Sequence, residues 1–194
     1  MTRRRLSPAR RRAELIDAAQ ARFAAKPYDQ VRLEDVAAAA GASPALIAFH
    51  FGGKRELYVA CLRAAVDELL ARHAALPGPP SADRLDASVR AHVEFATDHA
   101  AGYLAVVRGG SECTFPEVQE LLQEVRERLV EQLAAGLGRP RTPVLDLALR
   151  AYLGYVDTLT AHWLELDDAK RGQVPVESLA ALATGAFRGA LAAL

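Results

Sequence analysis

Apolar residues recur along the chain at steps of three and four, the spacing that places side chains on one face of an α-helix. The first such stripe follows Ser7-Pro8, a typical helix start, and stops at Pro27. Its members are Leu15, Ile16, Ala19 and Phe23. The same pattern, interrupted by glycine and proline, predicts helices over residues 8–26, 33–40, 43–51, 54–75, 82–100, 102–108, 116–136, 143–166 and 176–193.

No stretch shows the regular alternation of a β-strand, and β-branched residues are few. We therefore predict an all-α fold of about nine helices. The strongest break is Leu76-Pro77-Gly78-Pro79-Pro80, which we interpret as a domain boundary. It separates a three-helix head, residues 1–58, from a helical body, residues 76–194, and the helix over 54–75 connects the two.

Residues 33–50 have the spacing of a helix-turn-helix, in which two helices cross closely at a tight turn. The crossing requires a small residue on the first helix, which Ala37 supplies, and the turn favours glycine at positive φ, which Gly41 supplies. The second helix starts at Ser43 and would present its N-terminal end and outer face to a DNA major groove. On spacing alone, the alternative is an αα-hairpin that binds nothing.

The net charge of zero conceals an asymmetry along the chain. Residues 1–58 contain eleven Lys and Arg and six Asp and Glu, a net charge of +5, so the remainder carries −5. A basic head on an acidic body is typical of a nucleic-acid-binding protein. The arginines at 3–5 and 10–12 are candidates for contacts with the minor groove or with phosphates, or else form a solubilising tail.

Residues 10–58 also resemble the N-terminal domain of the tetracycline-repressor (TetR) family. The similarity rests on ELIDAAQARFA and on YDQVRLEDVAAAAGASPALIAFHFGGKRELY. The family pattern is an Ile-x-x-Ala-Ala-x-x-x-Phe helix, at whose first position this chain has Leu15, then an Ala-Gly turn, a helix started by serine and an aromatic-His-Phe-x-x-Lys-x-x-Leu segment. The resemblance implies an all-helical homodimeric regulator, usually a repressor, whose C-terminal domain binds a small molecule that alters affinity for an operator.

Three positions depart from the family pattern. Arg32 stands where a threonine usually caps the second helix, so a cap is lost and a cation is added. Ala42 replaces a larger aliphatic residue in the turn, which predicts looser packing. Ala48 replaces a tyrosine that contacts phosphate, so we expect binding of the DNA backbone to depend on His50, Lys54 and the arginines.

Lys54 stands at the start of a helix, where the macrodipole disfavours a cation unless an anion is held there too. We interpret it as a DNA-phosphate ligand, since no strand precedes it and Arg55 follows where a nucleotide P-loop needs serine or threonine. His50 either donates to phosphate or packs, and Phe49 either contacts a thymine methyl or packs. The predicted DNA-binding residues are Arg32, Ser43, Pro44, Ala45, Phe49, His50 and Lys54.

The helix over 143–166 is apolar on nearly every side, since Asp157 is the only fully charged residue between positions 151 and 164. Such a helix must be buried all round, for example between an internal cavity and a second subunit. In the last helix Gly185 and Gly189 permit close approach. Together the two helices predict a four-helix interface of a homodimer, and the alternative is an intramolecular core.

The helix over 82–100 carries a row of apolar and polar side chains that suits the wall of a ligand pocket. The row is Leu85, Ser88, His92, Phe95 and His99. Asp157 is costly to bury alone, so we expect a histidine or arginine partner, or a cationic ligand. The predicted ligand-binding residues are His92, Phe95, Tyr103, Asp157 and Trp163, each with a structural polar role as the alternative. The two histidines of the row lack the i, i+4 spacing of a helical metal pair, so we predict no metal.

We predict a ligand-responsive DNA-binding regulator, in the simplest form a repressor that binds a palindromic operator on double-stranded DNA, without a cofactor. The alternatives are a small helical enzyme with a basic head and an effector-free DNA-binding protein. An enzyme is disfavoured because no nucleophile–base pair can be assembled from spacing. With no signal peptide and no apolar span, we expect a cytoplasmic protein that makes no membrane contact. Cys61 and Cys113 are expected to be reduced and buried, with a thiol sensor as the alternative.

Overall fold

Ten α-helices and two short 3-10 helices make up the described residues of this computed structural model, which are 7–78, 82–138 and 140–193. The α-helices are α1 (Pro8–Ala25), α2 (Leu33–Ala39), α3 (Pro44–Phe51), α4 (Lys54–Ala74), α5 (Ala82–Asp98), α6 (Ala100–Val107), α7 (Pro116–Leu137), α8 (Pro143–Leu164), α9 (Asp168–Arg171) and α10 (Val176–Ala192). The 3-10 helices are η1 (Tyr28–Gln30) and η2 (Ser111–Thr114). The all-α prediction is confirmed, and each predicted helix is present within two residues of its expected ends. The single turn of α9 was not predicted, because it is too short to show a hydrophobic period.

Local capping explains why the helix starts were predictable. Ser7, Ser43 and Thr142 precede α1, α3 and α8, and each side-chain oxygen accepts a hydrogen bond from the backbone N–H three residues later, at 3.2–3.3 Å. A proline follows each cap and fits the first helical turn. Arg32 occupies the same position before α2 without a side-chain cap, so the predicted loss of a cap is confirmed.

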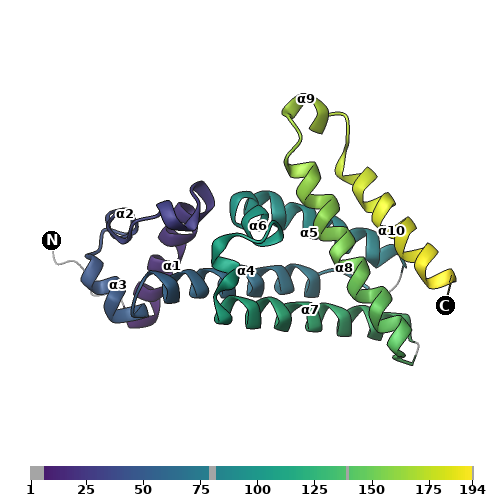
Figure 1. Cartoon of the computed structure of the whole chain (residues 1–194), viewed down its shortest axis with the longest axis horizontal. Helices are drawn as coiled ribbons and strands as arrows, with labels where there is room; N and C mark the ends of the chain where they lie inside the picture. Colours follow the sequence, from purple (N-terminus) through teal and green to yellow (C-terminus); the bar gives the residue numbers. More distant parts are fainter. Residues whose placement is uncertain (1–6, 79–81, 139, 194) are drawn as a thin grey trace.

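The head lies at one end of the molecule, and α4 runs from it into the body beside α7 (Figure 1). Each of α1–α4 contributes one large, fully buried side chain to the core of the head: Leu15, Val36, Ile47 and Leu57. Val118 of α7 belongs to the same core. The core of the head therefore includes a residue from a helix of the body.

The core of the body is formed by α5, α7, α8 and α10. Val130, Leu149 and Leu179 are buried at its centre, on three different helices. The helix pair α5 and α10 packs closely along its length, although the two helices are the first and last of this part of the chain. Helix α8 packs against both α5 and α10, with one side in the core of the body and the other at the surface.

Helices α8 and α10 carry large apolar residues that the rest of the described chain leaves exposed to solvent. Leu147 is 69% exposed and Leu182 is 54% exposed, and Val144 and Tyr155 are exposed beside them on α8. We call these four residues the α8–α10 face. In the single chain the outer side of α8 meets solvent, so its expected burial against a second subunit stays a prediction. Within the described ranges, no helix has the length and apolar composition needed to cross a membrane.

Candidate functional site

The crossing of α2 and α3 has the geometry of a helix-turn-helix. Ala37 is fully buried at the crossing, and Gly41 in the turn has φ +56°, a conformation that favours glycine. The backbone N–H of Ala42 donates to the carbonyl of Ala37 at 2.8 Å and closes the turn. The roles predicted for Ala37 and Gly41 are confirmed.

The outer face of α3 combines small residues with one large apolar side chain. Ser43, Pro44, Ala45 and Ala48 are all exposed. Phe49 is 81% exposed, the highest exposure among the large hydrophobic residues of the described chain. The alternative that Phe49 packs in the core is therefore wrong. A smooth face with one exposed aromatic ring suits entry into a major groove and apolar contact with thymine methyl groups.

The three predicted cationic or donor side chains, Arg32, His50 and Lys54, each contact another residue of the head. The Lys54 ammonium lies 4.4 Å from the centre of the Tyr28 ring and donates to the carbonyl of Asp29 at 3.4 Å. Arg32 is exposed, and its guanidinium lies 3.5 Å from the carboxylate of Glu34. His50 is half-buried, with its ring beside those of both neighbouring phenylalanines. His50 thus lies on α3 and Lys54 follows the end of α3 by three residues, whereas Arg32 lies at the N-cap of α2. Arg3, Arg4 and Arg5 lie outside the described residues.

The N-terminus of α4 differs from the predicted site, in which the Lys54 ammonium and the helix N-terminus hold one phosphate together. Its N-cap is Gly53, which offers no side-chain acceptor, and the Glu56 carboxylate folds back over it. A Cβ at Gly53 would lie 3.0 Å from the Oε2 atom of Glu56. The Glu56 carboxylate thus already interacts with the partial positive charge at the N-terminus of α4. A phosphate near Lys54 would therefore be held by the ammonium and by other cations rather than by the α4 amides.

Aromatic and charged residues join the head to the body. Tyr28 of the head meets Phe115, at the start of α7, with ring centres 5.3 Å apart. The guanidinium of Arg55 lies 4.6 Å above the Phe115 ring and forms an ion pair with Glu117. We call Tyr28, Arg55, Phe115 and Glu117 the head–body junction. Because Lys54 rests on Tyr28, the junction connects the proposed DNA-facing cation to α7.

A cavity of about 670 Å³ lies within the body and extends to the head. All five members of the predicted row on α5 line it, so the row is confirmed as a cavity wall. Helix α4 contributes a second wall from Tyr58 to Ala74, and α7 and α8 contribute two more. Most of the lining side chains are aliphatic or aromatic, so the cavity suits a largely apolar ligand.

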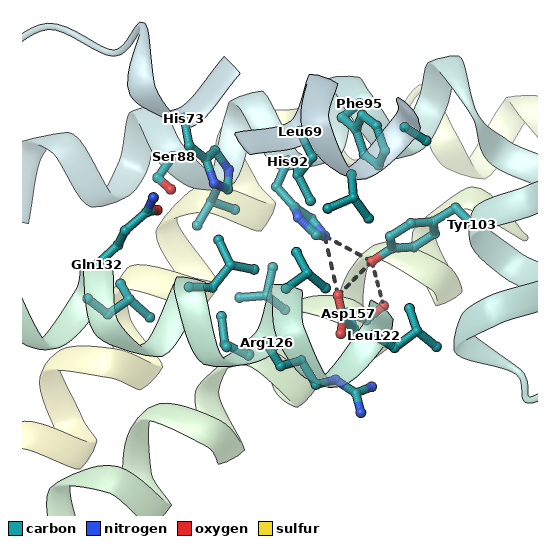
Figure 2. Close-up of a pocket in the computed structure, with 18 of the residues that line it drawn as sticks. Leu69, His73, Ser88, His92, Phe95, Tyr103, Leu122, Arg126, Gln132 and Asp157 are labelled. Carbon is teal, nitrogen blue, oxygen red and sulfur yellow. Dashed lines mark hydrogen bonds and ion pairs between the residues drawn. The ribbon is translucent and has the colours of Figure 1, made fainter. Parts of the chain in front are cut away.

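Three predicted ligand-binding residues form one polar cluster in the cavity wall. The Nε2 atom of His92 lies 2.9 Å from the hydroxyl of Tyr103, which donates to Oδ1 of Asp157 at 3.1 Å (Figure 2). Burial and the neighbouring carboxylate raise the pKa of Tyr103, so its hydroxyl stays protonated. Asp157 thus has the partners that its burial requires, including the expected histidine at 3.5 Å.

His73 and Gln132 also line the cavity and were missed by sequence reasoning. Figure 2 places them together with Ser88, away from Tyr103. Burial lowers the pKa of His73 to about 4, with smaller effects from the charges of His92 and Arg84 in the same direction. The signal for His73 was present, because it continues the helical stripe of Leu69 on α4 at a four-residue step.

Trp163 does not line the cavity, so its predicted ligand contact is not supported. Its indole N–H donates to the carbonyl of Val174 at 2.8 Å, and Arg171 lies over its ring. Trp163 therefore holds the segment between α8 and α10 against the end of α8. Phe95 does line the cavity, as predicted.

The cysteines differ in environment. Cys61 is buried, as expected, and burial raises the pKa of its thiol to about 12, which leaves little reactive thiolate. Cys113 is only half-buried, with its sulfur 3.7 Å from the carbonyl of Val106. Among the described residues, no group of histidine, cysteine and acidic side chains could hold a metal ion.

Two family models match this sequence. One, described as bacterial regulatory proteins of the tetR family, matches residues 15–61. The other, described as the tetracyclin repressor-like C-terminal domain, matches residues 81–187, more than half of the chain. The chain belongs to the TetR family. The resemblance seen in the head therefore extends to the body, and the predicted DNA-facing residues and the α5 wall fall within the two matched ranges.

Known relatives of this TetR-family chain include a curated activator. The HTH-type transcriptional activator FasR of Mycolicibacterium smegmatis is 34% identical over 101 residues, 51% of this chain and 46% of that protein. The match thus spans about half the length of this relative. A TetR-family regulator from Streptomyces coelicolor has a TM-score of 0.85 and 28% identity, over 97% of this chain and 83% of that one. FadR of Bacillus subtilis, solved with stearoyl-CoA, has a TM-score of 0.67 and 16% identity over 94% and 98%, a likeness of fold alone.

His73 makes the stability of this TetR-family protein dependent on pH. Its pKa falls from 6.5 to about 4 on folding, so within this window the unfolded chain binds more protons than the folded protein. The stabilisation is complete above pH 6.5 and is lost as the pH falls toward 4, by about 3 kcal/mol in total. As the pH is lowered from 6.5 to 4, we expect the urea-unfolding free energy of the wild type to fall by that amount relative to that of His73→Phe. The exposed His162→Phe variant should keep the wild-type profile, and parallel profiles for wild type and His73→Phe would contradict the expectation.

Proposed function

We propose that this TetR-family protein is a ligand-responsive repressor that binds a palindromic DNA operator as a homodimer. The observation that carries the proposal is the course of α4. This helix begins with Lys54 beside the DNA-facing α3 and continues with Leu62, Leu69 and His73 along the wall of the cavity. A ligand that displaces α4 would therefore act directly on the orientation of the head.

The dimer is proposed from the α8–α10 face. An uncovered face with several large apolar side chains marks an interaction surface. Small residues, including Gly154, Gly185 and Gly189, are exposed on the same two helices and allow the helices of a second copy to approach closely. A two-fold pairing of α8 and α10 would form a four-helix interface and place two copies of α3 in successive major grooves.

The effector is proposed to be a largely apolar small molecule. The cavity volume and the aliphatic lining support this class, as does the fold-level relative FadR with its bound stearoyl-CoA. Bound ligand would press on α4 and α7, which meet the head at Lys54 and at the head–body junction. The spacing of the two heads on DNA would then change.

Activation is the second candidate, and the relative FasR, an activator, favours it. The same DNA-binding and ligand-binding residues would serve either outcome, because the direction depends on where the operator lies relative to a promoter. A reporter gene driven by the natural promoter separates the two: repression predicts higher expression when this chain is deleted, and activation predicts lower expression.

DNA selection tests the proposal most directly. Purified full-length protein is incubated with duplexes of random sequence, and the bound duplexes are sequenced after repeated rounds. We expect enrichment of an inverted repeat with half-site centres about 10 base pairs, or a multiple of that, apart. Enrichment of no motif would remove the sequence-specific function, and a single unrepeated half-site would remove the dimeric mode of binding.

A further inference from the structure

Two residues that line the cavity, His73 and Tyr152, each have a buried polar atom with no hydrogen-bond partner among the described residues. The Nε2 atom of His73 makes no hydrogen bond within the described residues, although the residue is only 9% exposed. Its ring lines the cavity, and the Ser88 backbone is its other hydrogen-bonding contact. Because Nε2 has no partner and the Ser88 backbone favours a ring N–H, we assign the proton to Nδ1, which leaves a lone pair on Nε2. Buried acceptors in folded proteins are nearly always satisfied, so this atom indicates a missing donor.

The residues around His73 indicate the chemical character of the ligand that would carry this donor. Leu69, Leu85 and Val89 line the same cavity with aliphatic side chains. The Ser88 hydroxyl and the Gln132 amide lie at the His73 end and offer further hydrogen bonds to a polar head (Figure 2). An apolar body with one small polar head matches this arrangement.

Two other polar parts of the cavity wall, the cluster around Tyr103 and the Arg84 side chain, have partners within the chain. Tyr103 and Asp157 bond to each other and to His92, so this cluster needs no ligand donor. Arg84 donates to the backbone carbonyls of Gly78 and His73, the latter at 3.1 Å. His73 and Tyr152 remain as wall residues with a buried polar atom that a ligand would complete. Figure 2 places two further polar side chains, Ser88 and Gln132, beside His73.

A charged head fits this end poorly. The low pKa of His73 keeps its ring neutral near pH 7, so Nε2 is an acceptor and would face the oxygens of a carboxylate with a lone pair. A carboxylate would depend instead on Arg84, whose guanidinium already donates to the carbonyls of Gly78 and His73. An ammonium head would bring an unpaired charge into an aliphatic cavity that has Arg84 at the same end.

We propose that the cavity binds an uncharged amphiphile whose hydroxyl or amide N–H donates to Nε2 of His73 while its apolar chain lies between α4, α5 and α7. The inference rests on the proposed function, since it assigns the chemical class of the effector. The hydroxyl or amide group selects the ligand, and the apolar chain supplies most of the affinity.

The test compares ligands that share one chain and differ in the head. Full-length protein loaded with the fluorescent apolar probe N-phenylnaphthylamine is titrated at neutral pH with dodecanol, dodecanamide, methyl dodecanoate and dodecanoate. We expect the alcohol and the amide to displace the probe about tenfold more tightly than the methyl ester, which cannot donate. Equal displacement by alcohol and ester, or tighter binding of dodecanoate than of dodecanol, would overturn the inference.

A variant pair assigns the preference to His73. His73→Phe keeps a ring of similar shape and removes the acceptor, so the gap between alcohol and ester should close while the ester binds as before. His99→Phe is the matched control, because His99 also lines the cavity but its Nε2 already pairs with Glu68 at 3.1 Å. A gap that survives in His73→Phe overturns the assignment. The comparison of ligands on wild type stands even if a variant fails to fold.

The outcomes also separate this inference from the proposed function. Displacement by all four compounds without a preference for donors removes the His73 inference and leaves a ligand-responsive regulator intact. Failure of the probe and of every compound to bind counts against the cavity as an effector site, and so against the proposed function itself.

Discussion

Exchange of Leu147 and Leu182 for glutamate is expected to convert the protein to a monomer and to abolish specific DNA binding. Each dimer would bury four leucine side chains from these positions, which are 69% and 54% exposed in the single chain. Loss of their apolar burial, with four carboxylates placed in the interface, should weaken dimerisation by about 1,000-fold or more. Sedimentation equilibrium measures the mass, and titration of the selected operator measures DNA affinity.

A second pair of substitutions controls for charge. Gln119→Glu with Gln123→Glu adds the same negative charge at two exposed positions on α7, near the head and away from the α8–α10 face. This variant should remain dimeric. A leucine-to-glutamate variant that still sediments as a dimer would show that the α8–α10 face is not the interface.

Lys54→Ala is expected to weaken operator binding by about 100-fold at low salt, because a dimer loses two charge-assisted phosphate contacts. The loss should be nearly the same for operator and for unrelated duplexes, since phosphates carry no sequence information. The slope of log affinity against log salt should become shallower by about two. Fluorescence anisotropy with labelled duplexes over a range of salt concentrations measures both effects.

The contact of Lys54 with Tyr28 offers a second explanation for weaker DNA binding by Lys54→Ala, namely the loss of a residue that supports the head. A lysine that only supports the head would, when removed, lower affinity and thermal stability without changing the salt slope. Lys170→Ala is the control, because Lys170 lies in α9 and pairs with Asp167 at 3.0 Å, far from the head along the chain. A changed sequence preference with an unchanged slope would show that Lys54 reads bases rather than phosphates.

Short-range signals made the head predictable. Ala37, Gly41 and Ser43 each satisfy a steric or hydrogen-bonding requirement that involves residues at most five positions away, so the turn could be placed from sequence alone. The predicted row on α5 was correct for the same reason, since helical periodicity needs one helix only.

Long-range packing decided the features that could not be predicted from the sequence. Trp163 looked like a pocket residue, but its direction depends on Val174 and Arg171, which reach it through a bend in the chain. Glu56 was not expected to cover Gly53, because side-chain conformation is not encoded in spacing. The exposed side of α8 could not be told from a buried one, since an apolar helix has the same pattern whether its own chain or a second copy covers it.

The boundary of the cavity has a consequence for chimeric regulators. Gln20, Phe23 and Ala24 of α1 and Tyr58 of α4 line the same space as the residues of the body. A head transplanted from another regulator at residue 58 would replace part of the effector's binding wall as well as the DNA-reading surface. Hybrids of this kind would change their response to the inducer together with their operator, and independent exchange of the two specificities would require these four side chains to be retained.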